Sequence, residues 1–159
     1  MEQTGVVYIT KERLVELENI LIELKTIQRK NIADKIAEAR SHGDLSENAE
    51  YDAAKEAQTH LEMKIGKLEN LLSRVKLVNP AEMPNDEVHI LSNVKVIDLK
   101  HKEEITFTLV SHDEADFELD KISITSPIGK ALLGKKVGNT VVVDAPDGTM
   151  EYKILGISK

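Results

Sequence analysis

The stretch that decides the fold is SHGDLSENAEYDAAKEA, residues 41–57. It separates two long segments of helical periodicity, and Gly43 is the residue type that most often ends a helix and lets the backbone reverse. Two helices joined by so short a turn must run antiparallel. The small side chains of Ala53, Ala54 and Ala57 would let these helices approach closely. The stretch therefore predicts the thin, exposed tip of a helical hairpin.

Both flanking segments carry apolar residues at alternating spacings of three and four, the pattern of a helix that packs along one seam. The first segment begins after Thr10, a suitable helix cap, and its pattern slips at Gln28 before it resumes. The expected seam residues are Leu14, Leu17, Leu21, Leu24, Ile32, Ile36 and Ala39, then Tyr51, Ala54, Gln58, Leu61, Ile65, Leu68, Leu72 and Val75. Each helix would have roughly 30 residues and a length of about 45 Å. Mutual burial of the two stripes predicts an antiparallel coiled-coil hairpin.

The composition changes after residue 78. All four prolines lie beyond Lys76, and apolar residues then follow the spacing of strands. Strands are expected at residues 88–90, 94–99, 105–109, 122–124, 141–143 and 152–157. A short helix is expected in SPIGKALLGKKVG, residues 126–138, with Ser126 as cap, Pro127 at the first position and Gly134 past the end.

The sequence therefore predicts an α+β chain with two domains. Residues 1–78 would form the N-terminal coiled-coil hairpin with an acidic tip, and residues 79–159 a globular antiparallel sheet with a short helix. The first nine residues, MEQTGVVYI, fit a strand, a segment packed on the first helix, or a loose end.

Composition and charge exclude several classes of protein. The 159 residues are 41% hydrophobic and 31% charged, which is typical of a folded soluble chain. A net charge of −7 argues against sequence-specific DNA contact, although a chain with this net charge can still carry a local basic patch. Without cysteine there is no disulfide or thiolate chemistry, and no window has the character of a signal peptide or membrane span. We expect a cytoplasmic protein that does not contact a membrane.

Two carboxylates in the turn invite two interpretations. Asp44 and Glu47 have the D-x-x-E spacing of a capping box, in which each would satisfy backbone N–H groups of the second helix. Carboxylates at the end of a narrow projection are also well placed to enter a recess in another molecule. The interpretations are compatible, because a capping geometry would hold two carboxylates ready to share a hard cation.

Three stretches resemble the bacterial Gre transcript-cleavage factors. They are AEARSHGDLSENAEYDAAKE at residues 37–56, HDEADFE at residues 112–118 and ISITSPIGKALLGKKVGNTVVV at residues 122–143. The resemblance covers almost the whole chain in the order of the family. It implies a coiled coil followed by an FKBP-like domain, with RNA polymerase as the partner.

The resemblance also implies a chemistry for the tip. When polymerase backtracks, the nascent RNA 3′ end enters its secondary channel, and cleavage by two metal ions regenerates a usable end. By resemblance, Asp44 and Glu47 are the catalytic and metal-binding residues, donating carboxylates to a Mg²⁺ held jointly with polymerase. The protein would be an accessory factor that activates the polymerase's own cleavage, and not itself an enzyme.

Further roles follow from the same resemblance. Arg40 and Lys55 match a basic patch that meets the extruded RNA, and Thr125, Ser126 and Pro127 match polymerase contacts. The alternatives are a solvated face with ion pairs for the basic residues, among which Arg29 shares the face of Arg40, and a simple helix start for Ser126.

Four other residues of the tip are assigned less specific roles. Tyr51 is expected to pack in the seam, Asn48 to cap the tip or touch RNA, and His42 to be an exposed histidine, while Glu50 lies inside the matched motif.

Two rival functions remain open at this point. One is a Gre-like protein that binds the channel and inhibits cleavage, and the other is a coiled-coil scaffold without chemistry. A prolyl isomerase is disfavoured because Phe107, Phe117 and Tyr152 are too few aromatic residues for the pocket of such an enzyme, and a fold alone does not confer activity.

The isolated protein is expected to bind Mg²⁺ weakly, because two carboxylates on an exposed turn leave most of the coordination sphere to water. Isothermal titration calorimetry of the protein without polymerase tests this. Tight binding in that experiment would contradict a shared site.

Overall fold

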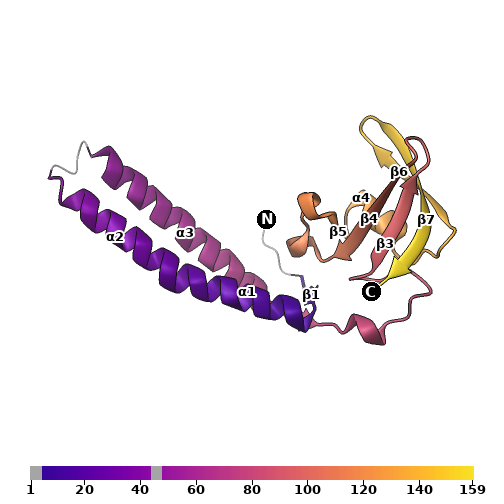
Figure 1. Ribbon diagram of the computed structural model, residues 1–159, viewed down its shortest axis with the longest axis horizontal. Helices are drawn as coiled ribbons and strands as arrows, with labels where there is room; N and C mark the ends of the chain where they lie inside the picture. Colours follow the sequence, from indigo (N-terminus) through magenta and orange to yellow (C-terminus); the bar gives the residue numbers. More distant parts are fainter. Residues whose placement is uncertain (1–4, 44–47) are drawn as a thin grey trace. The chain divides into compact units, whose positions relative to one another are not determined.

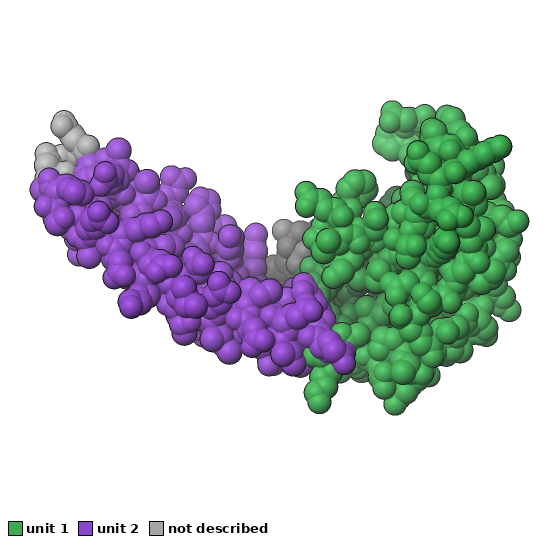
Figure 2. Space-filling view, in the orientation of Figure 1, with its two compact units in different colours: residues 1–11, 74–159 green, residues 12–73 purple. Residues whose placement is uncertain are grey.

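The computed structural model describes residues 5–43 and 48–159, which fall into two compact units (Figure 2). One unit is Glu12–Ser73, and the other combines Met1–Lys11 with Arg74–Lys159. The expected architecture, a helical hairpin followed by a sheet with one short helix, is confirmed. No helix in the described parts of the chain combines the length and apolarity needed to cross a bilayer.

The helical unit consists of two antiparallel arms (Figure 1). The first arm is α1 (Lys11–Glu23), η1 (Leu24–Gln28) and α2 (Arg29–Arg40), and the second is α3 (Ala49–Ser73). The buried residues of the unit are Leu17, Ala39, Ala54, Leu61 and Ile65, and all of them belong to the expected seam. The other expected seam residues of the two arms are half-buried. Helix α3 ends two residues before Val75, however, which was expected in the seam and lies in a strand instead.

The slip in the apolar pattern coincides with η1, which is a π-helical turn. From Leu24 to Ile36 the seam advances in three steps of four residues, one residue more than the heptad pattern allows. A π turn holds an extra residue, so the insertion is absorbed locally and α2 again faces α3. Ion pairs between the arms lie at this level, Arg29 Nε to Glu62 Oε1 at 2.9 Å and Lys25 Nζ to Glu69 Oε2 at 3.7 Å.

Asn48 joins the two arms next to the tip. Its Oδ1 accepts a hydrogen bond from Tyr51 N at 3.1 Å, so Asn48 caps the first turn of α3. Its Nδ2 donates to the Ala39 carbonyl at 2.7 Å, in the last turn of α2. Gly43 has a φ of 102°, the left-handed conformation expected of the glycine that ends the first arm. The amide side chain of Asn48 therefore accepts from a backbone N–H at the start of α3 and donates to a backbone carbonyl at the end of α2.

The globular unit is built on a five-stranded sheet of order β5-β4-β3-β7-β6 (Figure 1). The strands are β3 (Asn93–Asp98), β4 (Glu103–Val110), β5 (Lys121–Ser123), β6 (Thr140–Ala145) and β7 (Gly148–Ser158), and the helix is α4 (Pro127–Leu132). The core cluster of buried apolar residues is Val88, Val94, Val96, Phe107, Leu109, Leu132, Val141, Val143, Tyr152 and Ile154. Because Leu132 belongs to it, α4 is anchored on the sheet by the same core.

Two details of this sheet differ from expectation. Strand β5 pairs parallel with β4, because residues 111–120 form a crossover with the short turns η3 (His112–Glu114) and η4 (Phe117–Leu119). Residues 88–90 are not a strand, since Leu91 has a φ of 69° and a turn follows at once. Val88 instead pairs with the chain after α4, through Val88 N to Lys135 O and Gly134 N to Val88 O, both 2.8 Å.

Residues 7–9 form a strand, one of the alternatives that the sequence left open for the N-terminal segment. β1 (Val7–Ile9) pairs parallel with β2 (Val75–Leu77), and both Val7 and Ile9 are buried. This pairing moves residues 1–11 and 74–78 into the globular unit, so the compact units are cut differently from the expected domains at residues 1–78 and 79–159. A further turn, η2 (Pro80–Glu82), connects β2 to the sheet.

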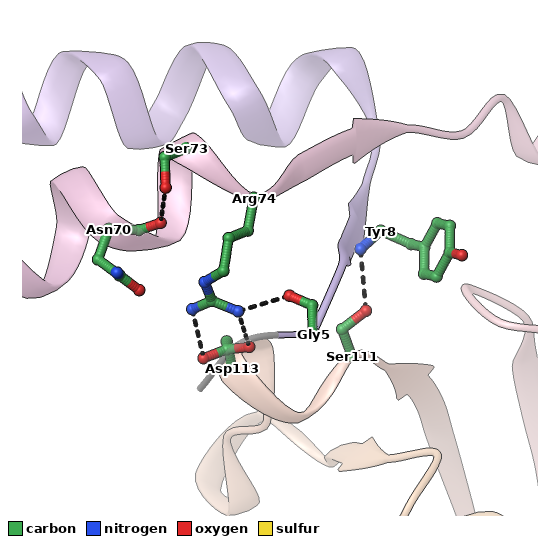
Figure 3. A network of polar contacts seen from close by, with 7 residues as sticks. All are labelled: Gly5, Tyr8, Asn70, Ser73, Arg74, Ser111 and Asp113. Carbon is green, nitrogen blue, oxygen red and sulfur yellow. Dashed lines mark hydrogen bonds and ion pairs between the residues drawn. The ribbon is translucent and has the colours of Figure 1, made fainter. Parts of the chain in front are cut away.

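An ion pair fixes this small sheet to the loop after β4 (Figure 3). The Arg74 guanidinium donates to both carboxylate oxygens of Asp113, at 3.1 and 3.2 Å, and to the Gly5 carbonyl at 2.7 Å. The two side chains are only 13% and 9% exposed. Nearby, Tyr8 N donates to Ser111 Oγ at 2.9 Å. These contacts hold β1 and β2 against the loop after β4, within the globular unit.

Replacing Asn48 tests the cap. Asn48→Ala is expected to destabilise the hairpin by about 1 to 2 kcal/mol and to speed hydrogen exchange of the Tyr51 amide. Asn48→Asp keeps the acceptor for Tyr51 but lacks the donor for Ala39, so its loss should be smaller. Asn19→Ala, at an exposed position within α1, is the matched control. Unchanged exchange at Tyr51 in Asn48→Ala would contradict the assignment.

Replacing Asp113 tests the ion pair. Asp113→Ala leaves a mostly buried guanidinium without its carboxylate and should lower the free energy of unfolding by about 2 to 3 kcal/mol. Glu104→Ala removes the exposed pair of Lys95 and Glu104, separated by 3.2 Å, and should cost about 0.5 kcal/mol or less. Urea unfolding measures the free energy of unfolding of both variants. Equal decreases would contradict the claim that burial makes the Arg74–Asp113 pair the stronger of the two.

Candidate functional site

The two carboxylates predicted to act at the tip, Asp44 and Glu47, lie outside the described residues. They belong to the segment that links Gly43, after α2, to Asn48, before α3. Among the described residues, Asn48 caps the first turn of α3. The capping-box interpretation of Asp44 and Glu47 therefore also falls on residues outside the described ones.

Two acidic residues with exposed side chains follow this segment closely in the chain. Glu50 and Asp52 lie in the first turn of α3, where negative charge is favoured by the helix dipole. Glu50 Oε2 is 3.2 Å from His42 Nε2, and these side chains are 72% and 53% exposed. Within residues 5–43 and 48–159, no three histidine, aspartate or glutamate residues gather closely enough to hold a metal ion.

The basic residues of the hairpin are not equivalent. Arg29 donates from Nε and Nη2 to both oxygens of Glu62, at 2.9 and 3.0 Å, and these hydrogen bonds raise the pKa of Arg29 above its ordinary value. The ion-pair alternative thus holds for Arg29. Arg40 instead lies over the Tyr51 ring, with its guanidinium carbon 5.9 Å from the ring centroid, a cation–π distance.

Lys55 lies one helical turn beyond Tyr51, on the same face of α3. Its Nζ donates to Gln58 Oε1 at 3.0 Å, a neutral partner. Among the described residues, neither Arg40 nor Lys55 is within ion-pair distance of a carboxylate. The structure therefore leaves both positive charges without local neutralisation by those residues.

A shallow groove of about 390 Å³ lies between the arms near the tip. It is lined by Lys35, Glu38, Glu50, Ala53, Ala54 and Ala57. The alanines have short side chains, and therefore this end of the hairpin is narrow and bordered by charged groups.

The segment predicted to contact polymerase is tightly held. Ser126 Oγ donates to the Ser123 carbonyl at 2.6 Å and accepts from Gly129 N at 3.1 Å, so Ser126 caps α4 as the sequence predicts. Thr125 is fixed by Ser123 Oγ, which accepts from Thr125 N at 3.1 Å. A Cβ on Gly129 would overlap the Ser123 carbonyl oxygen, so the close approach requires glycine. Thr125 and Pro127 remain exposed, whereas Ser126 is half-buried and chiefly structural.

Two features were not anticipated from the sequence. The second hydrogen bond of Asn48, to Ala39, connects residues nine apart, and only the spacing of a closed hairpin could have suggested it. Phe117 is 89% exposed, although the pattern treated it as an ordinary aromatic residue of the domain. The signal available for Phe117 was its position in HDEADFELD, where carboxylates surround the aromatic residue on both sides.

Comparisons with known proteins agree with this architecture. A family model described as transcription elongation factor, GreA/GreB, C-term matches residues 83–159, and one described as transcription elongation factor, N-terminal, matches residues 7–77. The transcription elongation factor GreA of Chlorobium phaeobacteroides (strain BS1) is 52% identical over 153 residues, covering 95% of this chain and 96% of that protein. GreA of Chlorobaculum parvum is 50% identical over 152 residues, with the same coverage.

Among solved structures, GreA factor homolog 1 (Gfh1) of Thermus thermophilus is 28% identical, covers 97% of this chain and 99% of that one, and has a TM-score of 0.45. The assignment rests on the family models and the curated relatives, which confirm the resemblance seen in the sequence. By two matching models that together span nearly its whole length and by about half-identical relatives, the chain belongs to the GreA/GreB family of transcription elongation factors.

Proposed function

We propose that this elongation factor binds RNA polymerase, inserts its hairpin into the secondary channel and stimulates the polymerase's own cleavage of backtracked RNA. The observation that carries the proposal is the construction of the tip. The two arms are closed by Asn48, and the GDLSEN motif connects them at the narrow end of the hairpin. The family membership and the GreA relatives support the same activity.

Asp44 and Glu47 would be the residues that act on the reaction. Their carboxylate oxygens are ligands of the type that Mg²⁺ prefers, and one or two carboxylates are a common protein contribution to a Mg²⁺ site. A Mg²⁺ held between them and polymerase would stabilise negative charge and lower the pKa of a bound water. The chain itself would contribute position, since the motif that carries these carboxylates connects two helices that Asn48 joins.

The positive charges at the base of the tip would meet the extruded RNA. Arg40 and Lys55 lack a carboxylate partner among the described residues, so their charge is available to phosphate. Such contacts attract any RNA sequence and weaken with salt. Arg29 is excluded from this role because Glu62 already holds its guanidinium through two hydrogen bonds.

The globular unit would attach the factor to polymerase through the exposed side chains of Thr125 and Pro127, with Ser126 holding the segment in place. A protein–protein contact gains from a segment that is already rigid, because less conformational entropy is lost on binding. The hydrogen bonds from Ser123 and to Gly129 N supply that rigidity.

A transcript-cleavage assay tests the proposal. Polymerase is stalled in a backtracked complex with end-labelled RNA, and the protein is added with Mg²⁺. We expect shortened RNA with the wild type and loss of at least roughly a hundredfold in the cleavage rate with Asp44→Asn plus Glu47→Gln, the scale seen when charge-stabilising groups are removed from active sites. Binding of the variant to polymerase should be unchanged.

The control is Asp34→Asn, an exposed carboxylate of α2 away from the tip, which should leave cleavage unaffected. Protection of the RNA by the wild-type protein would instead indicate an inhibitor of cleavage. Indifference of the RNA to the wild-type protein would leave only a scaffold role.

A further inference from the structure

The most exposed large apolar side chain in the described parts of the protein is Phe117, at 89%. Leu119, two residues later in η4, is 62% exposed. The other phenylalanine of the chain, Phe107, is buried in the core against the ring of Tyr152, with a centroid distance of 6.1 Å. Phe117 and Leu119 thus contribute little to the core, and an exposed aromatic beside a leucine is typical of a binding surface.

The turn that carries these side chains is rigid. Its ends are closed by two backbone hydrogen bonds of 2.9 Å, Asp116 N to Lys121 O and Lys121 N to Asp116 O. Asp116 Oδ1 accepts from Glu118 N at 3.0 Å, and Asp120 adopts a left-handed conformation with φ of 54°. The Asp120 carbonyl also accepts from Thr108 N of β4 at 2.9 Å. An aromatic side chain on such a turn is presented at low entropic cost to a partner.

The charges around the turn restrict the partner. Asp116, Glu118 and Asp120 are exposed and alternate with the two apolar residues along the turn, while Lys121 is half-buried. An acidic rim repels RNA, DNA and anionic lipid surfaces. It also opposes self-association, since a symmetric dimer would bring two identical acidic rims together. A protein surface with an apolar centre and a rim of lysine or arginine is the complement of this arrangement.

The turn and the segment Thr125–Pro127 lie at opposite ends of the same edge strand. Strand β5 starts at Lys121, which closes the turn, and ends at Ser123, which holds Thr125. Three residues of strand span about 10 Å. Both sites therefore fit within one protein–protein interface of standard size, about 800 Å² on each partner.

We propose that Phe117 and Leu119, with the acidic rim of Asp116, Glu118 and Asp120, form an apolar docking surface for a basic-rimmed patch of RNA polymerase. This inference rests on the proposed function and adds a second contact to the segment Thr125–Pro127. The aromatic side chain supplies buried apolar area in the complex, and the carboxylates select a basic partner and speed its encounter.

The test is the affinity of the full-length protein for polymerase, measured with a fluorescent label on the protein. Phe117→Ser plus Leu119→Ser should weaken binding by roughly tenfold or more, as expected for loss of a hot spot. Its thermal unfolding should be unchanged, because both side chains are already exposed. Val142→Thr, which alters an apolar side chain 57% exposed on β6, is the matched control and should bind like the wild type.

A charge reversal examines the rim separately. Glu118→Lys keeps the turn, because only the backbone N–H of Glu118 takes part in it. Its affinity for polymerase should fall several-fold at low salt, with a smaller difference from wild type at high salt. Equal affinity of Glu118→Lys and wild type at low salt would overturn the choice of a basic partner.

The outcomes separate this inference from the proposed function. At saturating concentration the Phe117 and Leu119 double variant should still stimulate cleavage, whereas Asp44→Asn plus Glu47→Gln should bind without stimulating it. If the wild type stimulates cleavage and the double variant binds as tightly as Val142→Thr, the docking surface is wrong and the function stands. If the wild type does not bind polymerase, both are wrong. A wild-type dimer in sedimentation equilibrium that the double variant converts to monomers would assign the surface to a second copy and overturn the proposal.

Discussion

The structure depends on the burial of one apolar seam between two antiparallel arms. Neither arm could remain helical alone with its leucine and isoleucine stripe in water, so each arm is the other's main source of stability. The seam tolerates an inserted residue because η1 absorbs it in a π turn, and the ion pairs of Arg29 and Lys25 hold the arms together at that level. The helical unit, Glu12–Ser73, is therefore held together by contacts between its own two arms.

The two ends of the hairpin are stabilised by different means. Near the tip, where alanines leave little apolar surface to bury, Asn48 links the arms by hydrogen bonds, and Arg40 lies over the Tyr51 ring of the other arm. At the base, β1 and β2 pair with each other, and the mostly buried ion pair of Arg74 and Asp113 secures them to the loop after β4. The same loop continues into the turn that exposes Phe117. The carboxylate that pairs with Arg74 and the surface proposed to meet polymerase are thus parts of one connected segment of the globular unit.

The parts of the fold that could be predicted are those whose signals are local and repeated. The seam, the reversal at Gly43 and the start of α4 at Ser126 and Pro127 all follow from spacing and residue type. The pairing of β1 with β2 could not be predicted, since it joins three-residue strands far apart in the chain and so short a strand has no measurable periodicity. The parallel pairing of β5 depends on the path of residues 111–120, which has no regular pattern. The apolar run at Val88 predicts a strand but does not form one. A buried segment that pairs with no neighbouring strand can have the same apolar pattern as a strand.

For the candidate site, the sequence supplied the residue types and the structure supplied their partners. The structure distinguishes Arg29, which Glu62 holds, from Arg40 and Lys55, which have no carboxylate partner among the described residues. It also assigns the cap of α3 to Asn48.

The central claim concerns Asp44 and Glu47, and its most direct test is the Mg²⁺ dependence of RNA cleavage by a backtracked polymerase. With the wild-type protein, the Mg²⁺ concentration for half-maximal cleavage should fall, and with Asp44→Asn plus Glu47→Gln it should match that of polymerase alone. A wild-type protein that accelerates cleavage without changing this concentration would contradict a shared Mg²⁺ site.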